Sequence, residues 1–481
     1  MNWSQYQLAV FDRVGRPGNL FVKAVAGSGK TTVIEEYIKR IPFERSVLAM
    51  AYNCHIRDEL MRRLSPYPNV TVKNLNGFGN GIIKENTGWA KVKDTKTIDV
   101  LFFDVLGGAK SEALKSVYYK TRRGVEKIVG LCKNMCIWAP TADDIIGLAM
   151  DFDINVPDEV HSWVEMIQKT MELSWQKPKT IDFDDQIAYP LYHKMDIPQF
   201  DEVVVDEAQD LSSSQRELCI RASRDKLVFV GDPRQAIYQF RGADEKSVET
   251  IIATADCIVL PLSVCYRCSK AVVNGAKKLV PDIEYHPAAK EGIYDRMSEE
   301  RYRGCVVGGD VILCRCTAPL VQECLRLIRE DNKATVKGRD IGEKLLELVD
   351  AATGDEGLSV EHFATELHLI VADKIKRHPK NEQEWQDKQD TIECFFSTCQ
   401  TVADIKRKII SIFEDKQDES GIRLMTVHKS KGLENRRIFL IRPDLLPHPK
   451  SRDLEAENNL HYVAITRAKE DFWYVDAPQK R

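Results

Sequence analysis

The sequence contains no long hydrophobic run and almost no excess of charge of one sign. No apolar stretch approaches the roughly 18 residues that a membrane-spanning helix requires. The amino-terminal Met1–Ser4 lacks the basic and then apolar segments of a signal peptide, so we expect a cytoplasmic protein without a membrane partner. The formal net charge of −4 argues against a surface that coats nucleic acid non-specifically, so any site for a polyanion must be a local groove.

The 13 cysteines come without the other features of an exported, disulfide-rich protein, so we expect reduced thiols. Two close pairs, Cys265-x-x-Cys268 and Cys314-x-Cys316, could in principle bind zinc or an iron–sulfur cluster. No matching His or Cys knuckle accompanies either pair. Each pair lies in or beside an apolar strand, where cysteine serves as a small core residue, and a metal centre is therefore not predicted.

Buried strands and helices alternate in both halves of the chain. Val47–Ala51 and Glu202–Val205 are apolar strand candidates in the first half, and Val311–Cys314 and Arg437–Arg442 are examples in the second. Such alternation is typical of parallel sheets covered by helices on both faces. With 481 residues, of which 43% are hydrophobic and 30% charged, we expect a soluble α/β protein of several domains.

Two regions depart from this alternation and have helical periodicity with few strands. The first runs from about Lys84 to Lys179. Its helix candidates are Ser111–Lys120, Val125–Cys136 and Asp158–Met171. Within it, Tyr118–Arg123 interleaves aromatic and basic residues, which indicates either a weak nucleic-acid signal or a solvated helix end. The second, shorter region lies between Ile341 and about Glu419 and includes Lys374–Asp387, where most charges are expected on solvated helix faces.

A strand, a glycine-containing loop and a helix start follow one another at Asn19–Thr32. The spacing fits A-x-x-x-x-G-K-T, with Ala24 where the general phosphate-loop pattern has its first glycine, a change that is tolerated if φ stays negative. The backbone of such a loop cradles phosphates, its lysine reaches the β and γ phosphates, and the next hydroxyl binds Mg²⁺. The residues predicted to bind nucleotide, with Thr31 as Mg²⁺ ligand, are Ala26, Gly27, Ser28, Gly29, Lys30, Thr31 and Thr32.

An acidic pair follows the strand Glu202–Val205 at its carboxyl end, which is where ligands of open α/β sheets gather. Asp206 is placed to hold Mg²⁺ through water. Glu207 is placed to accept the proton of the water that attacks the γ phosphate. The alternative, an acidic cap on the strand, leaves the position of this pair downstream of a phosphate loop unexplained.

The buried strand Leu227–Val230 leads into a segment that contains Gln235, Tyr238 and Phe240. Gln235 follows a strand end near the phosphate site, which suits a sensor of the γ phosphate. The two aromatic residues could stack on bases, because such stacking tolerates any sequence and is worth about 1–3 kcal/mol per base. Taken alone, either aromatic would more often be a core residue.

Several motifs follow one another between Gln7 and Lys469. They are the phosphate loop, Val205–Asp210, Gly231–Gln235, Cys265–Arg267, Leu424–Glu434 and Tyr462–Ala468. Their order resembles the UvrD/Rep/PcrA group of superfamily 1 helicases. An ordered set of this kind is far more specific than a phosphate loop alone, which many unrelated ATPases share.

The resemblance implies two RecA-like parallel-sheet domains, each with a helical insertion. ATP and Mg²⁺ would bind between them, and hydrolysis would move the protein along single-stranded DNA, usually 3′ to 5′, and open tailed duplex DNA. We expect a monomer. The implied division is a first RecA-like domain at 1–84 and 180–256, its insertion at 85–179, a second RecA-like domain at 257–340 and 420–481, and its small insertion at 341–419.

The resemblance also implies roles for single residues. The implied catalytic residues are Lys30, Asp206, Glu207, Gln235 and, as cationic fingers on the γ phosphate, Arg267 and Arg467. The implied contacts with adenosine are Tyr266 on the adenine face, Gln7 or its rival Gln5 on the adenine edge, and Glu434 near the ribose. The implied DNA contacts are Tyr52, Asn76, Tyr238, Phe240 and His428. For Gln7 a structural role is the alternative, because Ser4 and Gln7 have the spacing of a capping box.

Three departures from the family pattern bear on these roles. Cys265 stands where the family usually has Asn, Phe240 where it usually has Trp, and Asn74–Gly77 replaces Thr-Phe-His-Gly in a DNA-contacting block. The small second insertion leaves two hypotheses open: a helicase, or a translocating motor of a larger repair, recombination, replication or defence complex that unwinds little by itself. A catalytically silent binding module is a third hypothesis, and an RNA substrate is also open.

Overall fold

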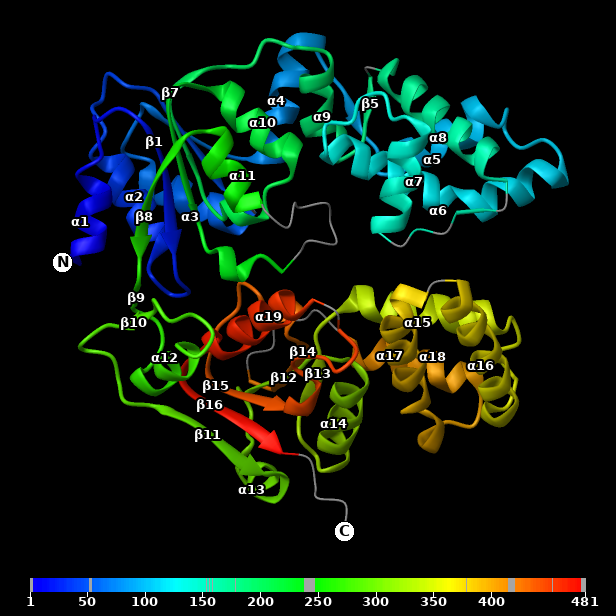
Figure 1. The fold of residues 1–481 in the computed structure, drawn as a ribbon. Helices are drawn as coiled ribbons and strands as arrows, with labels where there is room; N and C mark the ends of the chain where they lie inside the picture. The colour runs from blue at the N-terminus through cyan, green and yellow to red at the C-terminus, as the bar shows by residue number, and fades with distance from the viewer. Residues whose placement is uncertain are drawn as a thin grey trace. The chain divides into compact units, whose positions relative to one another are not determined.

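The computed structural model describes residues 3–51, 54–152, 154, 156–157, 159–177, 179–237, 247–377, 379–413, 420–451 and 453–476 (Figure 1). The chain forms two compact units: unit 1 comprises Met1–Ala24 and Gly29–Leu262, and unit 2 comprises Val25–Ser28 and Ser263–Arg481. Each unit contains a six-stranded sheet in which all neighbouring strands are parallel. The predicted α/β fold with two parallel sheets is confirmed.

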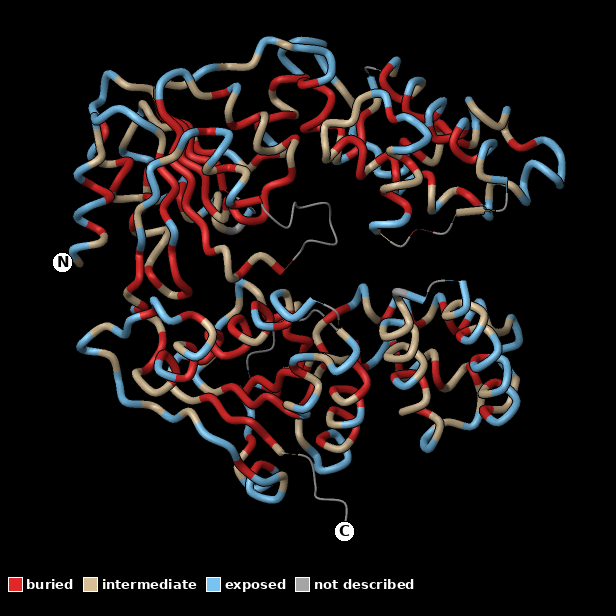
Figure 2. The backbone as a smooth tube through the Cα atoms, viewed as in Figure 1, coloured by how far each residue is buried: buried red, intermediate tan, exposed pale blue. Residues whose placement is uncertain are grey.

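The sheet of unit 1 has the strand order β3-β2-β6-β7-β1-β8. Its strands are β1 (Asn19–Ala24), β2 (Val47–Ala51), β3 (Val70–Asn74), β6 (Phe200–Val205), β7 (Ser223–Gly231) and β8 (Cys257–Leu262). Successive side chains point to opposite faces, so Leu20 and Val22 enter one hydrophobic cluster and Phe21 enters another. Both faces are buried along β2 and along the carboxyl-terminal parts of β6 and β7, as Figure 2 shows, and this explains the continuous apolar sequences there.

Helices cover both faces of this sheet. They are α1 (Gln5–Phe11), α2 (Lys30–Lys39), α3 (Cys54–Leu64), α4 (Leu75–Thr87), α9 (Asp185–Tyr192), α10 (Ser213–Ala222) and α11 (Ser247–Thr254). The predicted capping box at the start of α1 is confirmed: Gln7 N donates to Ser4 Oγ (3.3 Å) and Ser4 N donates to Gln7 Oε1 (3.0 Å). The helix ends at Phe11.

A helical region with its own hydrophobic core, centred on the fully buried Trp163, follows α4 in the chain. Its elements are β4 (Lys91–Val92), α5 (Lys96–Asp99), a π-helix (Val100–Val105), α6 (Glu112–Asn134), α7 (Ala142–Asp151), α8 (Val160–Trp175) and β5 (Thr180–Ile181). The prediction of separate helices at Ser111–Lys120 and Val125–Cys136 was wrong, because α6 runs through both. Gly124 does not break the helix; a Cβ there would lie 3.1 Å from the Trp163 ring, so glycine permits close packing of α6 on α8.

Buried ion pairs join this helical region to the start of α9. Lys96 Nζ lies 2.6 Å from Asp185 Oδ2, and Lys133 Nζ lies 2.6 Å from Asp182 Oδ2 and 2.8 Å from Asp185 Oδ1. Both lysines are buried, and each buried charge is paired, which is the arrangement that makes such burial tolerable. The ion pairs therefore anchor the helical region to the part of unit 1 that contains α9.

The sheet of unit 2 has the order β11-β16-β15-β12-β14-β13. Its strands are β11 (Ile293–Ser298), β12 (Val311–Cys314), β13 (Ala334–Val336), β14 (Ile422–Thr426), β15 (Asn435–Ile441) and β16 (Ala468–Asp476), with β9 (Val264–Cys265) and β10 (Glu284–Tyr285) paired separately. Its helices are α12 (Lys270–Ala276), α13 (Glu299–Cys305), α14 (Ala318–Arg329), α15 (Arg339–Ala352), α16 (Val360–Arg377), α17 (Glu382–Glu393), α18 (Val402–Ile412) and α19 (Leu454–Thr466). The predicted helical stretch Lys374–Asp387 spans the end of α16 and the start of α17 rather than one helix.

None of the helices in the described part of the chain combines the length and the apolar character needed to cross a bilayer. Among the same residues, no group of three or more His, Cys, Asp or Glu side chains is arranged to hold a metal ion. Cys265 and Cys314 are instead fully buried strand residues with free thiols.

Candidate active site

The phosphate loop connects β1 with α2 and needs two left-handed backbone conformations. Gly27 has φ 70° and Gly29, which caps α2, has φ 79°, values that residues with a Cβ rarely adopt. Ala24 ends β1 and is not among the described residues with positive φ, as its tolerance at this position requires. Val25–Ser28 groups with unit 2, where Tyr462 Oη accepts a hydrogen bond from Ala26 N (2.8 Å).

In unit 1, three neighbouring strands bring the predicted catalytic residues to one edge of the sheet. β1, β7 and β6 lie side by side, and their carboxyl ends carry Lys30, Asp232 and Asp206. Lys30 Nζ lies 2.7 Å from Glu207 Oε2, although the two residues are far apart in the sequence. Glu207 adopts a left-handed φ of 50°, and this turn points its carboxylate at the lysine while Glu207 N donates to Asp206 Oδ1 (2.9 Å).

Gln209 links the ends of β6 and β7, a role that the sequence did not predict. Its Nε2 donates to Glu207 Oε2 (2.7 Å), and its Oε1 accepts from Asp232 N (3.0 Å). Asp232 Oδ2 in turn accepts from Gln235 Nε2 (2.7 Å). Gly231 leaves room for this link, since a Cβ there would lie 2.6 Å from Gln209 Oε1. The network holds Glu207 and Gln235 in fixed positions at the same edge.

At this edge Asp206 and Asp232 are buried, Lys30 and Glu207 are half-buried, and each charge shifts the pKa of its neighbours. Burial, and then the charge of Glu207, raise the pKa of Asp206 to about 7, against the opposing effect of Lys30. Burial also raises the pKa of Asp232. Burial opposes the charged form of Lys30, but the surrounding carboxylates outweigh it and the pKa of Lys30 rises. The lysine therefore stays protonated at neutral pH beside a carboxylate that titrates near neutrality.

Replacing Asp206 with Asn is expected to stabilise the nucleotide-free protein, increasingly so with rising pH. The native pKa of Asp206 is about 7, above the ordinary value of 3.8, so ionisation costs folding free energy that accumulates between pH about 4 and about 7 and is constant above. The thermal midpoints of Asp206→Asn and wild type should therefore be close at pH 4.5 and differ at pH 7.5. They are measured by calorimetry.

Asp201, at the other end of β6, is the matched control, because its pKa is shifted in the opposite direction. Hydrogen bonds from Ser46 N (2.8 Å) and Ser46 Oγ (2.9 Å) hold the pKa of Asp201 below its usual range. Its ionised form contributes stability above the ordinary pKa that is lost as pH falls, so Asp201→Asn should destabilise at pH 7.5 and less at acidic pH. A pH-independent effect of Asp206→Asn would contradict the buried-carboxylate explanation.

Unit 2 brings together Tyr266, Arg267 and Glu434. Arg267 Nε lies 2.6 Å from Glu434 Oε2, and Lys469 Nζ lies 2.5 Å from Glu434 Oε1. Against the opposing effect of burial, these two bases keep the pKa of Glu434 below its usual range. The Tyr266 ring is 39% exposed and packs near the His286 ring, with 5.0 Å between centroids. An exposed aromatic face thus stands next to a paired arginine.

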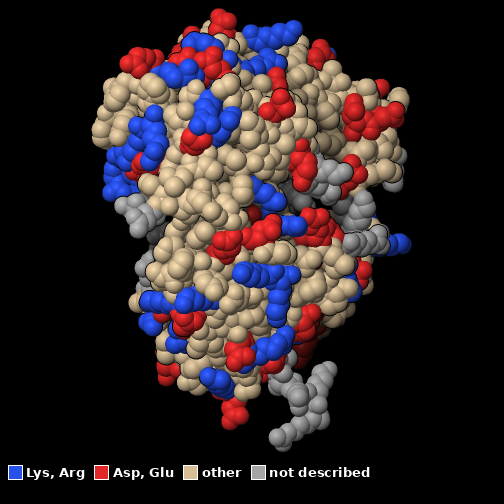
Figure 3. All heavy atoms as spheres, turned by 60° about the vertical axis from the view of Figure 1, so that its left-hand side comes forward, with Lys and Arg blue, Asp and Glu red and all other residues tan. Residues whose placement is uncertain are grey.

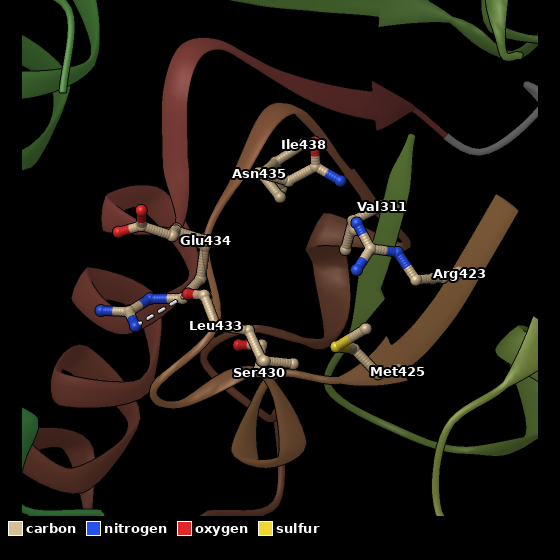
Figure 4. Close-up of a pocket in the computed structure, with 9 residues that line it drawn as sticks. Val311, Arg423, Met425, Ser430, Leu433, Glu434, Asn435 and Ile438 are labelled. Atoms are coloured by element: carbon tan, nitrogen blue, oxygen red, sulfur yellow. Dashed lines mark hydrogen bonds between the residues drawn. The ribbon is translucent and has the colours of Figure 1, made fainter. Parts of the chain in front are cut away.

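Arg467 is bound to the backbone of its own unit. Its Nε donates to Val463 O (3.1 Å) and its Nη1 to Leu433 O (3.1 Å), and the residue is almost fully buried. It borders a small pocket, shown in Figure 4, in which the Glu434 carboxylate points away from Arg423. The pocket volume of about 10 Å³ is close to that of a single water position, which excludes it as a nucleotide pocket.

Three predicted DNA contacts, Tyr52, Tyr238 and Phe240, lie outside the described residues. Of the others, His428 is half-buried in unit 2. Burial and then the positive charge of Arg315 lower the pKa of His428 to about 3, so the imidazole is neutral at pH 7. A phosphate contact from this residue would therefore be a neutral hydrogen bond rather than an ion pair.

Asn76, a predicted DNA contact, lines a polar groove of about 380 Å³ in unit 1. Phe183, which the sequence did not single out, lines the same groove. Asn76 Nδ2 donates to Phe183 O (3.1 Å), and the Phe183 side chain is 55% exposed in the same groove. Asn74 and Asn134 also line it. Phe183 lies between Asp182, which pairs with the buried Lys133, and Asp184, whose Oδ1 accepts a hydrogen bond from Asn134 Nδ2 (3.0 Å).

Charge is mixed over the molecular surface. On the face drawn in Figure 3, Lys and Arg side chains are interspersed with Asp and Glu. This distribution agrees with the net charge of −4 and with the expectation that any nucleic-acid site is local.

Two family models match the chain. The UvrD/REP helicase N-terminal domain matches residues 6–255, just over half of the 481 residues, and the UvrD-like helicase C-terminal domain matches residues 377–476. The chain is also similar to the ATP-dependent DNA helicase PcrA of Staphylococcus aureus (strain Mu50), with 22% identity over 96% of this chain and 82% of the relative. PcrA of Staphylococcus epidermidis (strain RP62A) is similar at 22% identity over 96% and 81%. The chain therefore belongs to the UvrD/REP helicase family of ATP-dependent DNA helicases.

Proposed function

We propose that this chain is a motor that hydrolyses ATP to move along single-stranded DNA, with 3′ to 5′ polarity, and that it opens tailed duplex DNA. The observation that carries the proposal is the buried edge of unit 1, where Lys30, Asp206 and Glu207 meet at the end of the phosphate-loop strand. A protonated lysine beside a carboxylate pair is the arrangement that phosphoryl transfer to water requires.

Each residue of this edge has a proposed role. Lys30 binds the β and γ phosphates, and Glu207 accepts the proton of the attacking water. Gln209 positions Glu207, and Gln235 senses the γ phosphate. The hydroxyl of Thr31 and the buried carboxylate of Asp206 are oxygen donors of the kind that Mg²⁺ prefers, and they would hold it. Mg²⁺, when bound, neutralises charge on the phosphates.

Further residues have proposed roles in nucleotide binding. Tyr266 has an exposed face for stacking on adenine, and Arg267 and Arg467 supply positive charge to the γ phosphate. Glu434 is proposed to lie near the ribose. Gln7 keeps its proposed contact with the adenine edge, with Gln5 as the rival. For Arg467 this role requires that its bonds to backbone carbonyls loosen when nucleotide binds.

We place one proposed DNA contact surface at the groove of Asn76 and Phe183. Phe183→Ala is expected to raise the single-stranded DNA concentration for half-maximal ATPase stimulation by about 5- to 150-fold, because a stacked base is worth about 1–3 kcal/mol. Turnover at saturating DNA should change little, since Phe183 is not among the residues proposed to bind or hydrolyse the nucleotide. The measurement is a titration of ATPase activity with oligonucleotide at fixed salt.

Phe43→Ala is the matched control for Phe183→Ala. Phe43 is similarly exposed, at 59%, but precedes β2 and so lies toward the amino ends of the strands, away from the proposed DNA surface. It should leave the DNA titration unchanged. An equal shift for both variants would show that loss of any exposed aromatic weakens binding, and would remove Phe183 from the proposed surface.

The function is tested by ATPase and strand displacement with 3′-tailed, 5′-tailed and RNA substrates, at stated salt. The proposal expects stimulation by single-stranded DNA and unwinding of the 3′-tailed duplex. Equal ATPase rates with and without DNA would reject translocation. ATPase stimulation without unwinding would instead favour a second function, a motor within a larger complex. The small size of the helical region α15–α18 supports this second function.

We propose that the protein acts in the cytoplasm as a monomer. Sedimentation measures the oligomeric state.

A further inference from the structure

We propose that Cys265 and Cys268 form an oxidative modification site, in which a hydroperoxide converts the two thiols to a disulfide and reversibly switches off ATP hydrolysis. The two cysteines enclose Tyr266 and Arg267 in the segment Cys265-Tyr266-Arg267-Cys268. Formation of the disulfide is independent of the proposed function, whereas its effect on turnover rests on the proposed roles of Tyr266 and Arg267.

The geometry places the two cysteines side by side. Cys265 ends β9 and Cys268 precedes α12, and both thiols are free. Cys268 N donates to Cys265 Sγ (3.4 Å), and Cys268 Sγ donates to Thr466 O (3.7 Å). The backbone of Cys268 therefore already contacts the sulfur of Cys265, and a disulfide requires that the Cys268 side chain turn from Thr466 O toward that sulfur.

The two thiols are also chemically unequal, as an attacking and a resolving cysteine must be. The hydrogen bond from Cys268, against the opposing effect of burial, lowers the pKa of Cys265 to about 7, and the charge of Arg267 contributes. The interaction with Cys265, and then burial, raise the pKa of Cys268. At neutral pH a large fraction of Cys265 is therefore thiolate, the form that reacts with peroxides, while Cys268 keeps its proton.

The reaction balances with a hydroperoxide as the oxidant. The Cys265 thiolate attacks one peroxide oxygen, so that an S–O bond forms, the O–O bond breaks, and the departing oxygen leaves as water after protonation. The Cys268 sulfur then attacks the resulting sulfenic acid: the S–S bond forms, the S–O bond breaks, and the hydroxide leaves as water with the Cys268 proton. Two thiols and one hydrogen peroxide give one disulfide and two waters, and a thiol reductant reverses the change.

The segment Val25–Ser28 controls access to the pair. A Cβ at Gly27 would lie 2.9 Å from Cys265 Sγ and 2.6 Å from Arg267 Cβ, and Tyr266 N donates to Gly27 O (2.8 Å). Both sulfurs are buried, so a peroxide reaches them only when this segment moves. A nucleotide bound to the phosphate loop should slow the oxidation, and the disulfide should in turn weaken nucleotide binding, because such coupling is reciprocal.

Closure of the disulfide ring changes the positions of the two residues between the sulfurs. Arg267 now pairs with Glu434, and Tyr266 presents an exposed face. Moving either one out of place removes a charge or a stacking surface from the proposed nucleotide site, and positioning errors of this kind are costly in catalysis. Turnover is expected to fall at least ~10-fold on oxidation, since an arginine that contacts the transferred phosphoryl group is worth more than that.

The test treats the full chain with hydrogen peroxide and then measures three quantities. Peptide mass spectrometry without reductant should find Cys265 and Cys268 linked, with the loss of two hydrogen atoms. Binding of a fluorescent ATP analogue should weaken and DNA-stimulated ATPase should fall, and dithiothreitol should restore both. The linkage and the nucleotide binding do not require translocation, so a failure of the proposed function leaves them measurable.

Three variants make the outcome decisive. Cys268→Ser keeps a donor for Thr466 O (3.7 Å in the wild type) but cannot form the disulfide. Before peroxide treatment its ATPase activity should equal that of the wild type. After treatment no linked peptide should form. Cys265→Asn, which carries the residue usual for the family, should resist peroxide. Cys314→Ser is the matched buried-cysteine control and should remain as sensitive as wild type. Absence of the linked peptide in wild type, or equal loss of activity in Cys265→Asn, overturns the proposal.

Discussion

Lys30→Ala is expected to reduce ATP turnover at least ~100-fold, because the phosphates lose a charged donor at the point where negative charge develops. Lys30 Nζ lies 2.7 Å from Glu207 Oε2 in the nucleotide-free protein. Burial opposes its charge, but Glu207, Asp206 and Asp232 outweigh burial and raise the pKa of Lys30. The substitution by alanine removes this positive charge from the phosphate site. The measurement is steady-state ATPase at saturating single-stranded DNA.

Lys39→Ala is the control for this prediction. Lys39 lies at the far end of the same helix, α2, where its Nζ is 2.5 Å from Glu35 Oε1 in a solvent-accessible ion pair. Such pairs contribute little, so the variant should fold and turn over ATP as wild type does. Turnover by Lys30→Ala within a few-fold of this control would contradict the assignment of the phosphate loop.

Glu207→Gln is expected to lower hydrolysis about 100- to 10,000-fold while ATP binding stays near the wild-type value. Glutamine can still accept the hydrogen bonds that Lys30 Nζ (2.7 Å) and Gln209 Nε2 (2.7 Å) donate to the native carboxylate. It cannot accept a proton from water. The fold of the site is thus preserved and only the proton acceptor is lost. Single-turnover hydrolysis and binding of a fluorescent ATP analogue measure the two effects separately.

Glu217→Gln supplies the matched control for Glu207→Gln. Glu217 lies on α10 of the same unit and pairs with Arg221 (2.7 Å) on an exposed surface. The same chemical change there should leave binding and hydrolysis unaltered. If Glu207→Gln hydrolysed ATP as fast as Glu217→Gln, another group would have to accept the proton, and Asp206, whose pKa is about 7, would be the next residue to test.

The catalytic edge of unit 1 was predictable because parallel sheets follow a simple rule. Strands buried on both faces appear as continuous apolar runs, and their carboxyl ends meet at one edge. Two residues separated by 177 positions, Lys30 and Glu207, could therefore be placed together from local patterns alone, and the hydrogen bond between them confirms that proximity. The capping box at Ser4 was equally local, since its partners are three residues apart.

Helix boundaries and side-chain partners were less predictable. The two helices expected at Ser111–Lys120 and Val125–Cys136 are one helix, α6, and the packing of Trp163 on α6 shows that Gly124 between them serves close contact rather than helix termination. The bridging role of Gln209 depends on the spacing between β6 and β7, which no local pattern contains. Likewise, the sequence of a family motif does not show whether its arginine is exposed or, like Arg467, bound to backbone carbonyls.

By itself, the sequence determined the fold class, the family and the residues at the ends of the strands. These follow from hydrophobic periodicity and motif spacing, which are properties of neighbouring residues. Only the tertiary structure decided which polar groups are buried and what they touch: the raised pKa of Asp206, the exposed ring of Phe183, and the hydrogen bond from Cys268 N to Cys265 Sγ. The physical reason is that desolvation and side-chain pairing depend on segments that meet only in the folded chain.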